Sequence, residues 1–298
     1  MFHYMGAPIL KGISEDLFLS RPEFAAILDF VHRSLCPLDP ETFLTLLEER
    51  RLPPGATLLT FDDCAARMID EALPQLASRN MKACFFVNPG LMDAGRTVPA
   101  LELMDLCRSV PAGQYELYLP ELTAIGISNS ASRAAAYQRL WPKILRSPSR
   151  QLPALFDSMR TVFGVGQGIS PDARLASWDS LQRLHDEGMV IGNHTMFHST
   201  VEADGIEQFT ADIENAYQDL EAHFGPSRRR TFCYPYGRAI DATPATTASL
   251  QNLHTMSGFV TQGGVACAEK TGPLNLHGEE AAYSVGAVKL APLLATLR

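Results

Sequence analysis

The chain has 298 residues, of which 46% are hydrophobic and 19% charged, so it can bury one large core in an ordinary globular fold. Its formal net charge of −8 argues against nucleic acid and anionic membranes as partners, because both bind clustered Lys and Arg. No segment reaches the roughly 18 consecutive apolar residues of a transmembrane helix. The start, MFHYMGAPILKG, lacks the features of a signal peptide, and the scattered cysteines form no CxxC motif. We therefore expect a cytoplasmic protein with reduced thiols.

Short apolar strands alternate with longer amphipathic segments, which predicts βαβ units and a parallel sheet. In chain order, strands are expected at 2–5, 56–61, 82–87, 189–194, 230–234, 258–262 and 273–277, and helices at 23–35, 41–51, 65–80, 177–188, 207–225, 243–256 and 286–297.

The alternation stops between residues 98 and 175, where three helical segments are separated by Pro, Gly and Ser. We predict a helical insertion in a single domain covering 1–298. The apolar faces of its helices should pack near the end of the parallel sheet that carries the catalytic mouth, or they should form a homo-oligomer contact. Residues 96–160 contain eight Lys or Arg and five Asp or Glu, a surplus that indicates either a solvated face or attraction for an anionic substrate. The glycine-rich GVGQG at 164–168 lacks the GK[ST] ending of a phosphate loop and is predicted to be a flexible connection.

Two adjacent carboxylates, Asp62 and Asp63, end the apolar run LLTFDDC at 58–64. They indicate either a strand running into a solvated turn or a site that holds a cation.

Two histidines provide the further ligands that a cation would need. His194 and His198 lie four residues apart in IGNHTMFHST, after a predicted strand. Ligands at the carboxyl ends of parallel strands converge on one mouth of a barrel. Together with Asp63, the histidines would leave coordination positions for water and substrate, as in a catalytic site.

The segments TFDD, HTMFH and FCYPYG resemble, in order, the three main motifs of the NodB-type polysaccharide deacetylases, carbohydrate esterase family four, in the FxYPYG branch. The resemblance covers about 1–92 and 176–262 and leaves the insertion unmatched. It implies an α/β fold, a distorted (β/α) barrel of the NodB type.

The resemblance also implies a role for each motif residue. One divalent ion, with zinc expected before other divalent transition metals, would be held by Asp63, His194 and His198. Asp62 would be the general base that takes the proton of the attacking water, and the backbone N–H of Tyr236 would face the oxyanion. His277, in PLNLHGEE, would be the general acid. Substrate-binding residues would be Tyr234, Pro235 and Gly237.

Two positions depart from the family pattern. Cys64 stands where the family often has Gly after the paired aspartates, and Cys233 stands where it often has an Arg that orients the base. The orienting partner of Asp62 is therefore open.

We expect a metal-dependent hydrolase that removes an N-acyl group, acetyl before others, from an amino sugar, another saccharide or a related small molecule. A deformylase or another C–N amide hydrolase on the same scaffold is the nearest alternative. A metal-retaining binding protein without turnover is a second one. A non-haem iron oxygenase also uses two histidines and a carboxylate, but with HxD spacing.

Overall fold

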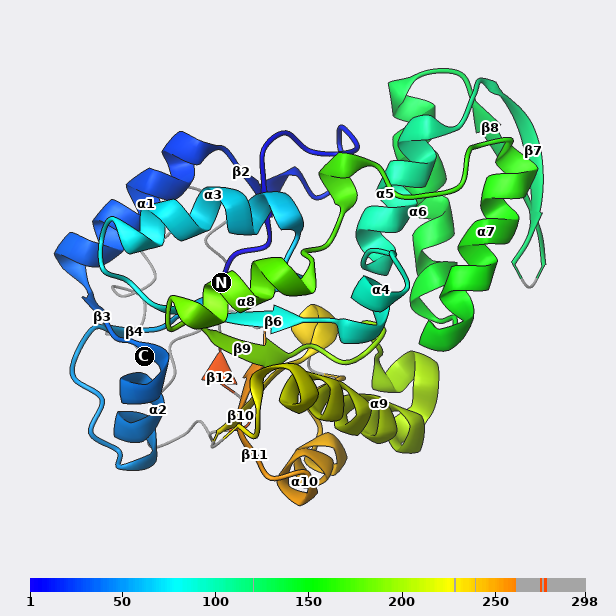
Figure 1. Cartoon of the computed structure of the whole chain (residues 1–298). Coiled ribbons are helices and arrows are strands. Elements are labelled where there is room, and N and C mark those ends of the chain that lie inside the picture. Colours follow the sequence, from blue (N-terminus) through cyan, green and yellow to red (C-terminus); the bar gives the residue numbers. More distant parts are fainter. Residues whose placement is uncertain (120, 228, 239, 261–273, 275, 278–298) are drawn as a thin grey trace, which may run out of the picture.

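A curled sheet of six parallel strands forms the centre of the computed structural model (Figure 1). The structure describes residues 1–119, 121–227, 229–238, 240–260, 274 and 276–277. The strands are β5 (Leu59–Phe61), β6 (Ala83–Val87), β9 (Val190–Asn193), β10 (Arg230–Cys233), β11 (Thr255–Val260) and β12 (Leu276–His277). They pair in the order β12-β11-β10-β9-β6-β5. This sheet confirms the predicted distorted (β/α) barrel; within the described ranges the pairing does not close into a ring.

Helices cover the sheet, and each of them except the short α4 overlaps a helix that the sequence predicted. They are α1 (Arg21–Ser34), α2 (Pro40–Glu48), α3 (Ala66–Ala77), α4 (Pro89–Asp93), α8 (Trp178–Asp186), α9 (Val201–Phe224) and α10 (Pro244–Asn252). In Figure 1, α1 and α3 lie together on one side of the sheet, and α9 and α10 lie on the other. Two minor parallel pairs join β1 (Tyr4–Met5) to β2 (Phe18–Leu19) and β3 (Cys36–Pro37) to β4 (Ala56–Thr57). The helix expected at 286–297 lies outside the described residues.

Stacked aromatic rings support the first strands of the sheet. The Phe61 and Phe85 rings are stacked with centroids 4.5 Å apart, and Phe2 stacks on Phe61 at 4.9 Å. All five residues of β6 are buried, as in a parallel strand covered on both faces. This packing fixes the carboxyl ends of β5 and β6, from which the candidate site extends.

The insertion is mainly helical but contains a hairpin that the sequence analysis did not predict. Its elements are α5 (Pro99–Ser109), β7 (Gly113–Tyr118), β8 (Leu122–Ile127), α6 (Ser130–Leu145) and α7 (Leu152–Phe163). β7 and β8 pair antiparallel, and the rings of Tyr115 and Phe163 meet edge to face at 5.0 Å, so the hairpin packs against α7. Figure 1 shows the insertion on the side toward which β6 and β9 point.

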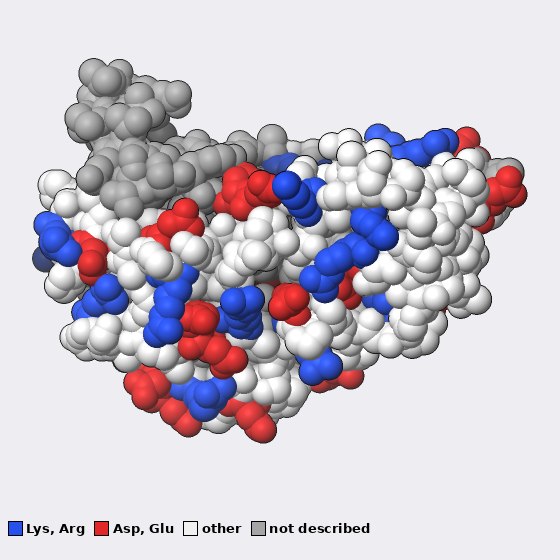
Figure 2. All heavy atoms as spheres, turned by 90° about the horizontal axis from the view of Figure 1, so that it is seen from above, with Lys and Arg blue, Asp and Glu red and all other residues white. Residues whose placement is uncertain are grey.

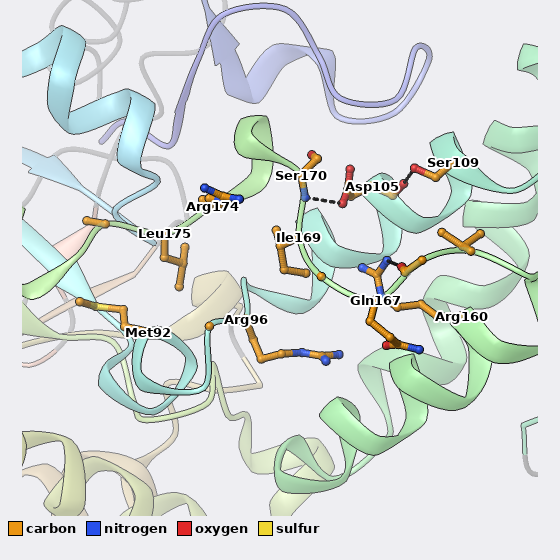
Figure 3. A pocket seen from close by; sticks show the side chains of 15 residues that line it. Met92, Arg96, Asp105, Ser109, Arg160, Gln167, Ile169, Ser170, Arg174 and Leu175 are labelled. Carbon is orange, nitrogen blue, oxygen red and sulfur yellow. Dashed lines mark hydrogen bonds between the residues drawn. The ribbon is translucent and has the colours of Figure 1, made fainter.

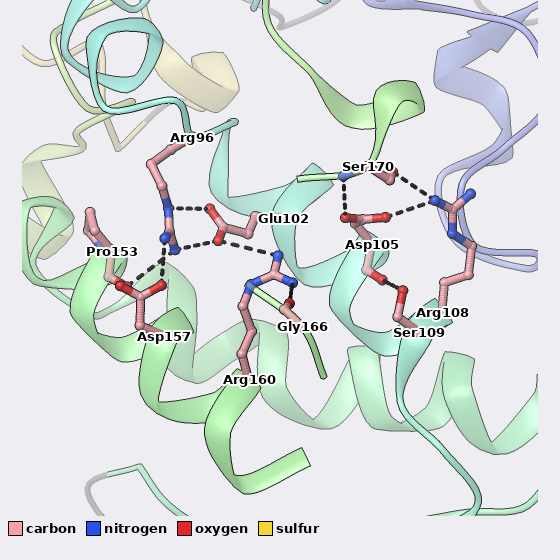
Figure 4. Close-up of polar contacts among 10 residues, drawn as sticks. All are labelled: Arg96, Glu102, Asp105, Arg108, Ser109, Pro153, Asp157, Arg160, Gly166 and Ser170. Atoms are coloured by element: carbon pink, nitrogen blue, oxygen red, sulfur yellow. Dashed lines mark hydrogen bonds and ion pairs between the residues drawn. The ribbon is translucent and has the colours of Figure 1, made fainter. Parts of the chain in front are cut away.

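Arg96 ties the elements of the insertion together (Figure 4). It precedes α5, and its guanidinium contacts Glu102 of α5 and Asp157 of α7, the latter at 2.6 Å. Because Glu102 is buried and Arg96 nearly so, this pairing holds α5 against α7 in a fixed arrangement.

The surface carries both signs of charge. On the face seen in Figure 2, acidic and basic side chains are interspersed rather than gathered in one patch. Within the described ranges, no helix is both long enough and apolar enough to span a bilayer.

The turn after β5 has an unusual backbone. Asp63 and Cys64 both lie in the left-handed region, with φ of 63° and 51°. Glycine adopts this conformation without a Cβ clash, which accounts physically for the family's frequent glycine at the position of Cys64.

We predict that Cys64→Gly changes the free energy of unfolding by less than about 1 kcal/mol, because relief of the left-handed backbone offsets the lost thiol packing. Cys64→Val should cost about 2 kcal/mol or more, because a β-branched residue is poorly tolerated at positive φ. Urea unfolding measures both. Cys84→Val, the same exchange in strand β6, is the matched control and should cost less. Equal losses in the two valine variants would contradict this account.

Candidate metal centre and active site

Asp63, His194 and His198 converge at the carboxyl ends of the strands. Asp63 Oδ1 lies 3.4 Å from His194 Nε2 and 3.2 Å from His198 Nε2, and the ligand atoms of all three lie within 4.8 Å of one another. In a tetrahedral zinc site with bonds of about 2.1 Å, neighbouring ligand atoms are about 3.4 Å apart. The three buried side chains therefore fit a cation with little rearrangement.

The strand order produces this convergence. Asp63 follows β5 and His194 follows β9, and β6 lies between these strands. The His194 N–H donates to Val87 O at the end of β6, at 2.9 Å. Gly192 allows β9 to pack closely, because a Cβ there would lie 2.5 Å from the Phe86 ring.

Each oxygen of Asp63 has its own set of neighbours. The Tyr4 hydroxyl donates to Oδ2, and Oδ1 faces the two imidazoles. Tyr4, which lies in β1, is thus a residue of the site whose contact with Asp63 the sequence did not reveal.

A backbone carbonyl orients His194. His194 Nδ1 lies 2.8 Å from Cys233 O, and because a carbonyl only accepts, Nδ1 carries the hydrogen. Nε2 is thereby directed toward Asp63, the arrangement usual for a metal-binding histidine.

Burial and pairing act against each other on the pKa values of the cluster. Burial raises the pKa of Asp63, but hydrogen bonds to His194 and His198 outweigh it and hold that pKa well below its usual range. Burial lowers the pKa of both histidines. For His194, the contact with Asp63 and the charge of Asp62 reverse this and raise the pKa, whereas for His198 burial prevails.

Asp62 is held through one oxygen. It is 1% exposed, and the Cys233 thiol donates to its Oδ2 at 3.3 Å, with His3 Nε2 at 3.8 Å from the same atom. Among the described residues nothing hydrogen-bonds Oδ1. Cys233 therefore contacts the carboxylate that an Arg contacts in the family pattern, but as a weaker donor.

Asp212 of α9 supports the histidine loop, a contact the sequence analysis missed. Its Oδ2 accepts the backbone N–H groups of Met196, at 3.0 Å, and Phe197, at 3.3 Å, and the hydroxyl of Ser199. His198 in this loop has a φ of 57°, so the loop needs external support. The available signal was an acidic residue on the apolar stripe of a predicted helix, beside Ile213.

The residues of the third motif, FCYPYG at 232–237, lie partly in the hydrophobic core and partly at the candidate site. The Tyr234 side chain is buried and packs edge to face on Phe232 at 4.9 Å. Its role in substrate binding stays a prediction. Pro235, Tyr236 and Gly237 form the short turn η4 (Pro235–Gly237), and the Tyr236 ring meets His198 edge to face at 4.5 Å.

His277 ends β12, next to Val260 of β11, so the strand expected at 273–277 is confirmed for its last two residues, whereas 273 and 275 lie outside the described residues. Its role as general acid stays a prediction.

The insertion reaches the site. Trp141 of α6 meets the Tyr236 ring edge to face at 5.6 Å. Residues of the insertion, including Ile144 and Leu152, line a small cavity of about 10 Å³ with His198 and Tyr236. The expectation that the insertion packs near the mouth is therefore confirmed.

Comparison with known proteins agrees with this geometry. Residues 152–255 match the polysaccharide deacetylase family, a stretch that includes both histidines and Tyr236. A search among curated proteins found no match.

Solved deacetylase structures share the fold. PplD of Streptococcus pyogenes, in complex with acetate, aligns with a TM-score of 0.62 at 16% identity over 97% of this chain and 96% of its own. IcaB of Ammonifex degensii aligns at 0.52 and 19% identity, over 87% and 82%. The BpsB deacetylase domain of Bordetella bronchiseptica aligns at 0.54 and 15%, over 93% of each chain. The segment 152–255 is thus similar to polysaccharide deacetylases, and the chain shares the fold of the solved deacetylase structures.

Proposed function

We propose that the chain is a metal-dependent N-deacetylase of an amino sugar, free or within a saccharide. The observation that carries the proposal is the convergence of Asp63 Oδ1 with the Nε2 atoms of His194 and His198, beside the buried carboxylate of Asp62.

The donor set suits Zn²⁺, which binds imidazole nitrogen and carboxylate oxygen in four-coordinate sites. A divalent cation held here would supply Lewis-acid activation of a water molecule and of the acyl carbonyl. Tyr4 and the Cys233 carbonyl keep Asp63 and His194 in their binding orientations.

The residues around the cation perform the remaining chemistry. Asp62 accepts a proton as the water oxygen bonds to the acyl carbon. The Tyr236 N–H donates to the oxyanion, from a turn shaped by Pro235 and Gly237. The C–N bond then breaks, His277 protonates the amine, and acetate leaves.

The acyl group and the substrate are the finer parts of the proposal. PplD was solved with acetate, which supports acetyl as the acyl group. A deformylase remains the alternative within the same chemistry. The proposal has five further parts. The metal is zinc, the protein is cytoplasmic, and the chain belongs to the FxYPYG branch. Residues 1–298 form a single domain, and the insertion forms a homo-oligomer contact.

A metal-retaining binding protein is a separate candidate, suggested by Cys233 in place of Arg. The buried Asp62, whose Oδ1 has no hydrogen-bond partner among the described residues, favours turnover, because binding alone does not need a base. A screen of N-acetyl and N-formyl versions of amino sugars and saccharides, with acetate and formate both quantified, separates the three possibilities. Acetate release supports the proposal, formate release the deformylase, and binding without either product the binding protein.

The two carboxylates should respond differently to substitution. Asp63→Ala should lose metal and activity together, because one of three protein ligands is gone. Asp62→Asn should keep the metal while kcat falls by about 10²-fold or more, because an amide cannot accept the proton. Elemental analysis beside acetate release measures both effects. Equal metal loss in the two variants would mean that the roles are reversed or shared.

Cys233 should position the base. Cys233→Ala removes the donor to Asp62 Oδ2 and should lower kcat about tenfold, with KM and metal content unchanged. Cys233→Ser restores a donor and should recover most of the rate. Cys84→Ala, a buried thiol without a hydrogen bond to Asp62, serves as the control. Full kcat in Cys233→Ala would exclude the positioning role.

Asp212 should support metal binding without touching the metal. Asp212→Ala frees the loop that carries His198 and should weaken metal binding by about 10- to 100-fold. Glu214→Ala, an exposed change on the same helix, should leave the affinity unchanged. Competition with a chromogenic chelator gives both affinities. A folded Asp212→Ala protein with wild-type affinity would refute the prediction.

A further inference from the structure

A second cavity, which we call the insertion pocket, lies between the insertion and the rim of the barrel (Figure 3). Its volume is about 600 Å³, within the range of small-molecule sites. One wall is the segment 174–176, which pairs with residues 64–66 directly after Asp62 and Asp63. Met92 of α4, the helix that follows β6, forms another part of the wall. The pocket therefore borders the same end of the sheet as the candidate metal centre.

The charged side chains that line the pocket are three arginines and one acid, although the chain as a whole has a net charge of −8. The acid, Asp105, is already paired with Arg108 at 2.8 Å and accepts the Ser170 N–H at 3.0 Å. Arg174 is exposed, and no described side chain pairs with it. The remaining charge of the lining is thus positive, which attracts anions.

Arg160 is a buried cation with too few partners (Figure 4). It is 2% exposed, and within the described part of the chain its side chain makes one hydrogen bond, from Nη1 to Gly166 O at 3.3 Å. Its Nη2 lies 3.7 Å from Glu102 Oε1, beyond hydrogen-bond distance, and Nε has no hydrogen-bond partner among the described residues. A buried guanidinium in this state is costly unless a further anion or water completes it.

Glu102 cannot neutralise both arginines. Its two oxygens accept from Nε and Nη2 of Arg96. Burial raises the pKa of Glu102 to about 7, although Arg96 and Arg160 act in the opposite direction.

The loop at 164–170 leaves room for a ligand at its backbone. At Gly166 the φ lies outside the left-handed region, and no atom lies within 4 Å of the place where a Cβ would be. Neither the backbone conformation nor the packing of the described residues thus requires glycine there, whereas close approach of a ligand would. Gln167 and Ser170 add polar groups to the same wall.

We propose that the insertion pocket binds a carboxylate or phosphate group carried by a saccharide, so that the enzyme prefers anionic substrates. The planar forks of Arg160 and Arg174 match such groups, and Gln167 and Ser170 bind hydroxyl groups beside them. The saccharide part rests on the proposed function; the anion part rests on the pocket alone. The excess of Lys and Arg in the insertion would then attract the substrate and would not serve only as a solvated surface.

Calorimetric titration of the intact, metal-loaded protein tests the proposal without any turnover. The probes are glucuronate, glucose 6-phosphate and glucose. We expect at least one of the two anions to bind with an affinity about tenfold or more above that of glucose. The anion with the higher affinity shows whether the pocket prefers a carboxylate or a phosphate group. Failure of deacetylation with anion binding intact would refute the proposed function and leave the anion site standing.

Variants locate the binding. Arg174→Gln should lower the affinity for the anion about tenfold. Gly166→Leu should abolish anion binding, because the new side chain fills open space in the pocket without straining the backbone. Gln167→Ala, an exposed truncation, gives a second readout if Gly166→Leu does not fold. Arg50→Gln removes an exposed positive charge outside the pocket and should change nothing. Anions that bind no better than glucose, or equal weakening by Arg50→Gln and Arg174→Gln, would overturn the proposal.

Discussion

The structure depends on the neutralisation of two adjacent buried carboxylates. Asp62 and Asp63 are 1% and 4% exposed, and two like charges in such a place would be unfavourable without partners. The left-handed turn after β5 sends them to different neighbours: Asp63 to Tyr4 and the two histidines, Asp62 to Cys233. The fold, the metal proposal and the assignment of the base all rest on this separation.

The metal cluster could be predicted from the sequence because its members occupy equivalent places. Asp63 and His194 each follow a short apolar strand, and parallel strands bring such positions together. Their supporting residues could not be predicted in the same way. Tyr4 and Asp212 act through single contacts whose partners are set by the packing of distant elements, and no local pattern specifies those partners.

The insertion was the least predictable part of the fold. Its helices have clear periodicity, but the β7–β8 hairpin is a short alternating segment between two predicted helices and was treated as a connection. The strand expected at 56–61 contains both β4 and β5, which pair with different partners. The hydrophobic periodicity of a segment alone does not show where it stops pairing with one strand and begins pairing with another. Contacts such as Trp141 with Tyr236 then join the insertion to the mouth, so that it is part of the active region.

The contacts around the carboxylates span long stretches of chain. Tyr4 and Asp63 are 59 residues apart, and Cys233 and Asp62 are 171 apart. Bringing them together requires loop closures whose entropy is recovered only when the sheet is complete. A partly folded chain therefore cannot assemble the cluster, and a cation that binds it stabilises the native state selectively. Metal occupancy would then report the fraction of chains that have finished folding.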